Sequence, residues 1–353
     1  MSPVDSGTNK SAAGPWIVVV GMHRSGTSAV TGAIGALGFN VVSPQDRLSP
    51  HDSNPEHWES LSVLQHSDAV LAHFGGTWDA PPQLPEGWEN DSGLPDQTAA
   101  SEALTAAYPG PGSSVWKDPR ICLLLPYWRP VLQAPMAAVL VWREPLAVAR
   151  SLRRRDGTPL PYGVALWERY NRSAMANLAG TDVYVLAYDA LVEDPAVSLH
   201  GLTSWLGSIG IFDGMQSWDH ESALSVITAN LRHESVQTTG DDDRIVLKEQ
   251  RLLVDHLTQL AGAHQALPQL LGEESPWTEA ILDARRAQNI LAQRNLERLL
   301  QHCEGERDWY VEALEESRSH LASLKASSSW RMTAPVRSLA KLREASRHRR
   351  SMT

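Results

Sequence analysis

The chain has 353 residues, 42% of them hydrophobic and 20% charged, which is typical of a folded globular protein with room for one large α/β domain and additional elements. The formal net charge of −10 argues against a nucleic-acid-binding protein, because a phosphate backbone requires a basic surface. Cys122 and Cys303 have neither metal-site nor disulfide spacing, and the polar residues 1–15, taken as a disordered leader, lack the apolar core of a signal peptide. No apolar run reaches the roughly 20 residues of a membrane span, so we expect a cytoplasmic protein.

The first predicted element is a strand at residues 16–21, WIVVVG, whose continuous apolar run is typical of a buried parallel strand. The stretch GMHRSGTS follows at 21–28, and a helix is predicted over 26–37. Strand, glycine-bounded turn and helix are the context of a phosphate-binding P-loop. The pattern G-x-x-x-x-G-K-[ST] is met except that Thr27 stands where nucleotide-triphosphate sites have the lysine.

The rest of the first 275 residues alternates between helix and strand patterns. Residues 40–112 are loop-rich, with one helix expected at 60–74, and long loops of this kind usually carry sites. Further strands are predicted at 113–117, 136–142 and 182–188, and further helices at 121–132, 145–154, 159–178 and 195–206. This alternation predicts a P-loop-type three-layer α/β fold, in which helices flank a central parallel sheet on both faces.

A long amphipathic helix is predicted after this domain, at 276–325. Its apolar residues follow alternating steps of three and four, with polar residues at two positions of the series: Leu296, Leu300, Cys303, Tyr310, Leu314, Leu321 and Leu324. A coiled coil that makes a homo-oligomer, a strut on the body and a plain surface helix all stay open. We therefore divide the chain into the leader at 1–15, the P-loop domain at 16–275, this helix, and a basic tail at 326–353. The tail is either solvated or makes peripheral contact with an anionic membrane surface.

The loop offers backbone N–H groups and the positive end of a helix dipole to an anion. A magnesium–triphosphate site is poorly supported, because the lysine is missing and the strand at 136–142 ends in Arg143 rather than in an acidic residue. Arg143 follows the carboxyl end of a parallel strand, where open α/β sheets bind ligands, and Ser151 comes eight residues later. A surface salt bridge is the alternative role for Arg143.

Together these segments resemble the PAPS-dependent sulfotransferases, in particular bacterial members of the P-loop superfamily, including the carbohydrate-sulfating type. PAPS is 3′-phosphoadenosine 5′-phosphosulfate. The motif [RK]-[ST]-G-T-[ST] of that family matches residues 24–28, and its R-[DE]-P…S-L segment matches VWREPLAVARSL. Other family-like segments are NPEHWE (54–59), GGTWDAPP (75–82), WKDPR (116–120), AYDALVEDP (187–195) and LRHE (231–234). The resemblance spans roughly residues 16–235.

The resemblance implies that PAPS is the co-substrate, that PAP is the product and that no metal is required. It assigns the 5′-phosphosulfate to the loop and the 3′-phosphate to the arginine–serine pair. It assigns closure over the nucleotide to a late basic residue, Arg232, for which a plain surface role stays open. The donor-binding residues are then His23, Arg24, Ser25, Gly26, Thr27, Ser28, Arg143, Ser151 and Arg232.

Sulfuryl transfer needs a general base for the acceptor hydroxyl and fixed cations for the departing nucleotide. The resemblance makes Glu59 the best candidate base, since it ends the N-P-x-x-[YFW]-E pattern, with Glu56 and His57 as alternatives. His57 stands where the family usually has glycine. Arg24 and Lys117 are the candidate cations, and for Lys117 a structural Lys–Asp–Arg ion pair within WKDPR stays open.

The acceptor is predicted only by class. The segment SSSWRMTAPVRSL resembles a tail element of bacterial glycosyltransferases and associated glycan-processing proteins, which implies a carbohydrate or glycolipid acceptor. Trp58, Trp78 and Trp88 are candidates to stack on sugar rings, with core packing as the alternative. Two other functions stay open: a P-loop nucleotide or small-molecule kinase, and a non-catalytic nucleotide-binding scaffold for glycan enzymes.

Overall fold

The computed structural model describes residues 14–49, 57–210, 219–231, 242–270 and 272–327. The chain divides into two compact units, Met1–Arg286 and Ala287–Thr353. The predicted leader, apart from Gly14 and Pro15, and all but the first two residues of the predicted basic tail lie outside the described residues.

The first unit is built around a five-stranded sheet in the order β2-β1-β3-β4-β5. The strands are β1 (Trp16–Val20), β2 (Ser114–Lys117), β3 (Met136–Trp142), β4 (Val183–Ala187) and β5 (Gly262–His264). The first four pair in parallel, which confirms the predicted parallel sheet. β5 adds an antiparallel edge that the sequence does not predict, because three residues, Gly-Ala-His, carry no strand pattern.

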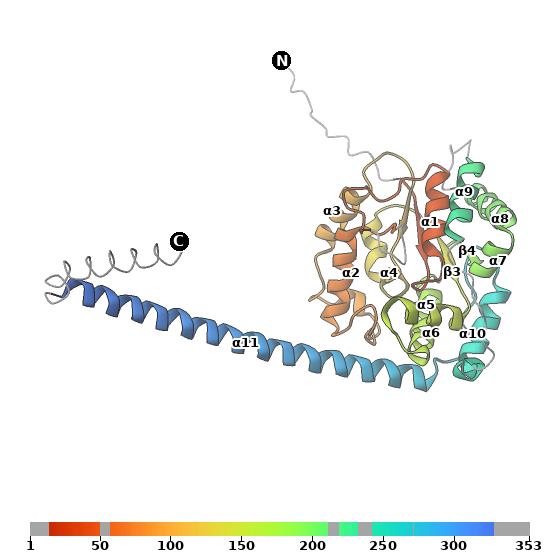
Figure 1. Ribbon diagram of the computed structural model, residues 1–353. Helices are drawn as coiled ribbons and strands as arrows, with labels where there is room; N and C mark the ends of the chain where they lie inside the picture. Colours follow the sequence, from red (N-terminus) through yellow and green to blue (C-terminus); the bar gives the residue numbers. More distant parts are fainter. Residues whose placement is uncertain (1–13, 50–56, 211–218, 232–241, 271, 328–353) are drawn as a thin grey trace, which may run out of the picture. The chain divides into compact units, whose positions relative to one another are not determined.

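Side chains of β1 enter two different cores, as expected for a central strand covered on both faces. Val18 and Val20 pack into one core together with residues of α4 (Ile121–Leu132) and α6 (Leu160–Asn177). Ile17 and Val19 pack into the other with residues of α1 (Thr27–Ala36), α8 (Pro195–Ser208) and α9 (His220–Leu231). Helices therefore cover both faces of the sheet (Figure 1), which confirms the three-layer α/β fold.

The predicted helices are present with shifts of a few residues at their ends, as α1, α2 (Leu61–His73), α4, α5 (Pro145–Asp156), α6 and α8. The elements that the sequence analysis missed are α3 (Gln97–Ala107), α7 (Tyr188–Glu193), α9, α10 (Lys248–Gln259), η1 (Trp88–Asn90) and η2 (Asp242–Ile245). α3 lies in a segment predicted to be loop. Asp96 caps it by accepting a hydrogen bond of 2.9 Å from the Thr98 N–H, and its alanines favour helix.

The last helix, α11 (Pro276–Ala326), confirms the predicted long C-terminal helix. Its first turns belong to the first unit, where Leu282 is buried and Glu279 pairs with Arg169. From Ala287 onward α11 belongs to the second unit, and its side chains there are almost all exposed to solvent. Within the described part of the chain, no helix is both long enough and apolar enough to cross a membrane.

Candidate active site

The loop between β1 and α1 is tightly enclosed by neighbouring elements. Two of its residues have positive φ, Arg24 at 70° and Gly26 at 88°. A Cβ on Gly26 would lie 2.2 Å from the Tyr188 ring, and one on Gly21 would lie 2.2 Å from the Val141 carbonyl oxygen. Both glycines are therefore required by close approach. Left-handed residues at alternate positions are a feature of the loops, called nests, whose backbone N–H groups bind anions.

Three of the predicted donor-binding residues meet at this loop. Arg24 Nε donates a hydrogen bond of 2.8 Å to Ser151 Oγ, and Arg143 Nη1 donates one of 3.3 Å to the Arg24 carbonyl oxygen. The Arg143 guanidinium also lies 4.2 Å from the centre of the Tyr188 ring. The Trp167 indole N–H fixes the end of β3 by donating to the Arg143 carbonyl oxygen at 2.8 Å. The structure thus places the loop beside the predicted arginine–serine pair.

The loop also holds a buried hydroxyl suited to an oxyanion. Ser25 is fully buried, and its Oγ has no hydrogen-bond partner among the described residues. The helix that follows, α1, has Gly26 as its N-cap residue and therefore no side-chain cap. An unpaired buried hydroxyl costs about 1–3 kcal/mol. An anion at the N-terminus of α1 would accept a hydrogen bond from it and face the positive end of the helix dipole. These groups fit the phosphate end of a ligand.

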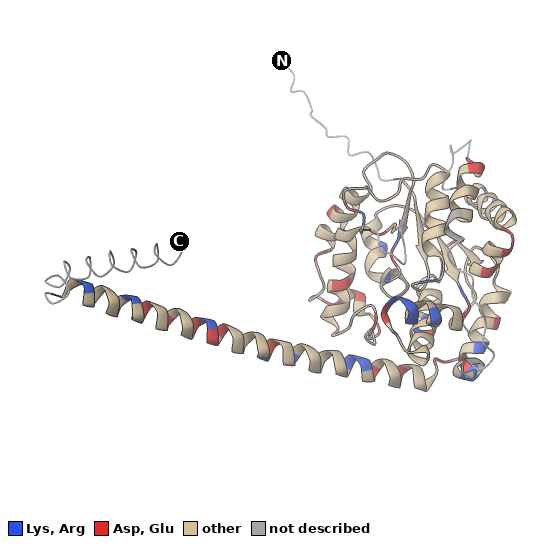
Figure 2. Ribbon diagram, viewed as in Figure 1, with Lys and Arg blue, Asp and Glu red and all other residues tan. Residues whose placement is uncertain are grey.

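Positive charge is concentrated around His23. Burial and then the charges of Arg120, Arg155, Lys117 and Arg24 hold the pKa of His23 well below its usual range. Figure 2 shows further basic residues on α5, the helix that carries Ser151. The imidazole is therefore neutral at neutral pH, and the same cations that keep it neutral favour an anion at the loop.

Glu59 and Lys117, two of the predicted catalytic residues, form a buried ion pair through Glu59 Oε1 and Lys117 Nζ. Burial acts to raise the pKa of Glu59, but the charge and hydrogen bond of Lys117, with Arg120 and His57, outweigh it and lower that pKa. Glu59 stands immediately before Ser60, whose Oγ caps α2 by accepting from the Val63 N–H at 3.1 Å. The carboxylate is therefore ionised and fixed in position.

The ion pair proposed within WKDPR is present between Asp118 and Arg120, but Lys117 is directed to Glu59 instead. Arg120 Nη1 lies 3.2 Å from Asp118 Oδ1, and its Nε donates to Asp68 at 2.6 Å. Burial raises the pKa of Asp118. Arg120 therefore has a structural role, although its charge reaches His23.

The remaining predicted residues have different surroundings. His57 is half-buried and close enough to Glu59 to lower its pKa. Thr27 is buried in the first turn of α1, and half-buried Ser28 follows it. Arg232 and Glu56 lie outside the described residues.

The three candidate tryptophans also differ. Trp88 belongs to the core beside Phe74, and the Arg47 guanidinium lies 3.9 Å from the centre of the Trp58 ring. Only Trp78 reaches the loop, with its ring centre 4.5 Å from that of His23.

Sequence reasoning missed Tyr188 and Arg155. Tyr188 directly follows β4, inside the family-like segment AYDALVEDP, so its position after a strand was a usable signal. The Arg155 guanidinium lies 4.9 Å from the centre of the Trp78 ring. It ends a run of three arginines in α5, and such a run does not indicate which member turns toward the loop.

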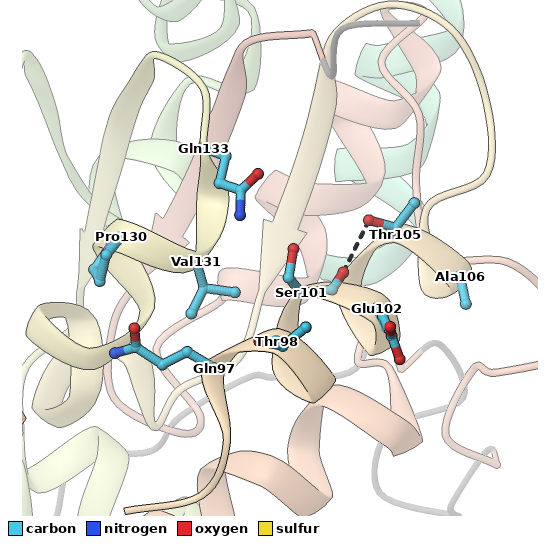
Figure 3. A pocket seen from close by; sticks show the side chains of 9 residues that line it. All are labelled: Gln97, Thr98, Ser101, Glu102, Thr105, Ala106, Pro130, Val131 and Gln133. Atoms are coloured by element: carbon cyan, nitrogen blue, oxygen red, sulfur yellow. Dashed lines mark hydrogen bonds between the residues drawn. The ribbon is translucent and has the colours of Figure 1, made fainter. Parts of the chain in front are cut away.

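A separate surface hollow of about 620 Å³ lies between α3 and α4 (Figure 3). Its lining is mostly polar: Gln97, Thr98, Ser101, Glu102, Thr105, Ala106, Pro130, Val131 and Gln133. Gln133 lies just before β3 begins, at the amino edge of the sheet, whereas the loop lies at the carboxyl edge. None of the predicted site residues lines this hollow, so it is not part of the candidate site.

No family model and no curated protein matches the chain. Solved structures do match in part. The sulfotransferase domain of an olefin synthase from Synechococcus PCC 7002 is 15% identical with a TM-score of 0.36, covering 78% of this chain and 96% of that one. A sulfotransferase domain from the curacin biosynthetic pathway is 15% identical with a TM-score of 0.35, covering 78% and 98%. A Mycobacterium tuberculosis sulfotransferase is 14% identical with a TM-score of 0.36, covering 63% and 77%.

All three structures are sulfotransferases. They are thus of the kind that the sequence motifs resemble.

Proposed function

We propose that the chain is a sulfotransferase that moves the sulfuryl group of PAPS to a hydroxyl of its acceptor. The observation that carries the proposal is the meeting of Arg24 with Ser151 and Arg143. Two sets of anion-binding groups lie side by side, one on the loop and one at the end of β3 and in α5. The 5′- and 3′-substituents of PAPS are attached to one ribose, so a ligand with two anionic groups close together fits this arrangement.

The donor is held at both anionic ends in this proposal. Ser25 Oγ, the Thr27 and Ser28 hydroxyls and the N-terminal amides of α1 receive the 5′-phosphosulfate. Arg143 and Ser151 receive the 3′-phosphate, with the guanidinium kept in place by the Tyr188 ring. Charge-assisted hydrogen bonds from a fixed guanidinium are the strongest polar contacts available for such a group. Arg232 is proposed to close over the bound nucleotide.

The reaction is an in-line displacement at sulfur. A bond forms between the acceptor oxygen and sulfur, the bond between sulfur and the bridging oxygen of the 5′-phosphate breaks, and PAP leaves with the bonding electron pair. Glu59 takes the acceptor proton. Arg24 and Lys117 stabilise the negative charge that grows on the bridging oxygen, as fixed cations do in partly buried sites.

The Glu59–Lys117 pair links donor binding to base strength. Before a donor binds, the Lys117 ammonium pairs with the Glu59 carboxylate and lowers the pKa of Glu59. A phosphosulfate beside Lys117 competes for the ammonium, so the pKa of Glu59 rises when the donor binds. The carboxylate then becomes a better base at the moment when it has a proton to accept.

The acceptor is proposed to be a carbohydrate or the glycan part of a glycolipid. The half-buried Trp78 ring beside His23 supports this class, because an aromatic ring next to the loop can stack on a sugar whose hydroxyl faces the sulfuryl group. The resemblance of the tail segment to glycan-processing proteins points to the same class.

Thermal unfolding with PAP and with ATP plus magnesium tests the donor. PAP should raise the melting temperature by linkage, whereas ATP with magnesium should not. Absence of a shift with millimolar PAP contradicts the proposal, and stabilisation by ATP with magnesium alone favours a kinase. Incubation with sulfur-labelled PAPS and a panel of sugars, glycolipids and phenols then tests the acceptor. Transfer only to phenols contradicts the carbohydrate assignment.

A further inference from the structure

In the second unit, α11 carries a row of apolar side chains, and no other described residue of that unit covers them. The row, called here the 296–324 seam, follows the a and d positions of a heptad repeat: Leu296, Leu300, Cys303, Arg307, Tyr310, Leu314, Ser317, Leu321 and Leu324. Leu296 is 57% exposed, Leu314 52% and Leu324 60%. Seven of these nine positions are apolar, and a row of this kind is stable in water only when a second helix covers it.

Charges beside the seam are arranged with opposite signs at its two ends. At the positions that follow each d residue, the first two residues are acidic, Glu297 and Glu304, and the last two are basic, Arg318 and Lys325. Val311 stands midway between the two pairs. Figure 2 shows both signs of charge along α11. Such a row complements a copy of itself turned end for end.

We propose that α11 pairs with α11 of a second copy of this chain in antiparallel orientation, with Val311 facing Val311 of the second copy. In this register Glu297 faces Lys325 of the second copy and Glu304 faces Arg318. Each of these two charge pairs occurs twice by symmetry. This interaction surface is independent of the proposed activity, since it lies in the second unit.

The same register also places apolar seam residues opposite apolar ones. Leu300 faces Leu324 of the second copy, Cys303 faces Leu321, and Tyr310 faces Leu314. The two polar seam residues then meet each other, because Arg307 faces Ser317 of the second copy. Arg307 already pairs with Asp308 of its own helix at 2.8 Å, so its charge is partly balanced beside the seam. From Leu300 to Leu324, no polar seam residue lies opposite an apolar one.

A parallel pair lacks these matches. In that orientation each seam residue faces its own counterpart, which places Arg307 against Arg307 in the middle of an apolar row. The four flanking contacts become Leu299 with Glu304, Glu306 with Val311, Ala313 with Arg318 and His320 with Lys325, and none of them joins opposite charges. The sequence therefore favours the antiparallel pair in both the seam and its flanks.

Charge exchange in the full chain tests the pairing, with sedimentation equilibrium as the readout. Glu304→Arg and Arg318→Glu should each raise the dimer dissociation constant about tenfold, because each turns two attractive contacts into repulsive ones. The double variant should recover the wild-type value, since each new charge again faces its opposite. Glu312→Arg, at the heptad position on the opposite side of the helix from the seam, is the control and should change nothing. A wild-type chain that is monomeric at 100 µM, or a double variant no better than the singles, overturns the proposal.

Disulfide trapping tests the orientation separately. Cys303 is exposed and Cys122 is buried, so only Cys303 should react under mild oxidation. In the antiparallel pair the two Cys303 residues are separated by eighteen residues of helix, about 27 Å, so the wild type should give no covalent dimer. Leu321→Cys should give one readily, and Leu321→Cys combined with Cys303→Ser should lose it. A wild-type disulfide dimer through Cys303 overturns the antiparallel register in favour of a parallel one.

Discussion

Arg24 Nε lies 2.8 Å from Ser151 Oγ and joins residues that are 127 positions apart in the chain. One comes from the loop after β1 and the other from α5, the helix after β3. β1 and β3 are neighbours in the sheet, so their carboxyl ends bring the loop and α5 together. In the proposed function this contact joins the loop that binds the 5′-phosphosulfate to the helix that binds the 3′-phosphate.

Ser151→Ala removes a proposed donor to the 3′-phosphate and the partner of Arg24. We expect PAP to bind about tenfold more weakly, since a hydrogen bond to a charged group contributes about 1.5–3 kcal/mol. Adenosine 5′-phosphosulfate, which has no 3′-phosphate, should bind the variant and the wild type equally. Isothermal titration with both ligands makes the comparison. An equal loss of affinity for both would assign Ser151 to the 5′-phosphate group instead of the 3′-phosphate.

Arg143→Ala should weaken PAP binding by about 100-fold, because a buried charged donor to phosphate is lost. Arg143→Lys should give an intermediate affinity, since lysine keeps the charge but not the planar fork that stacks on Tyr188. Fluorescence or calorimetric titration with PAP measures both. Wild-type affinity in Arg143→Ala would contradict the assignment of this residue to the 3′-phosphate.

Glu59→Gln should lower kcat by about 10²–10⁴-fold while PAP still binds, because the carboxamide cannot accept the acceptor proton. His57→Asn is the matched variant for the alternative base and should keep most of the activity. Single-turnover transfer from PAPS separates chemistry from binding. If Glu59→Gln stays active while His57→Asn does not, the base is His57.

Stability should fall as the pH drops below about 6.5, the ordinary pKa of histidine. The pKa of His23 is lower in the folded chain than in the unfolded one, so the unfolded state binds the additional proton and gains stability on acidification. The slope contributed by this one group approaches about 1.4 kcal/mol per pH unit. Urea unfolding of the wild type and of His23→Asn between pH 5 and 7.5 measures it, and equal slopes would contradict the burial of a neutral imidazole.

Gly26→Ala should destabilise the fold more than a substitution at another glycine of positive φ. At Gly26 an added Cβ would meet the Tyr188 ring, whereas at Gly180, with φ 70°, it would meet nothing within 4 Å. Gly180→Ala should therefore cost about 1 kcal/mol and Gly26→Ala distinctly more, with loss of PAP binding. Equal costs would show that Tyr188 does not enclose the loop.

The parts of the fold with strong local patterns were predictable. The run WIVVV at 16–20 and the glycine spacing of the loop depend on neighbours in sequence, and both are present. The edge strand β5 was not, because three residues carry no pattern.

In the site, the motif resemblance brought forward Arg24, Arg143 and Ser151, which the fold places in contact. The direct pairing of Glu59 with Lys117 and the stacking of Arg143 on Tyr188 depend on side-chain directions across the tertiary structure. A linear sequence does not contain those directions.

Calorimetric titration of the full chain with PAP tests the central claim most directly. The proposed function predicts binding of one PAP per chain, a loss of about 100-fold in affinity in Arg143→Ala, and no competition by ATP with magnesium. Absence of PAP binding to the wild type at millimolar concentration, or an affinity that Arg143→Ala leaves unchanged, would contradict it.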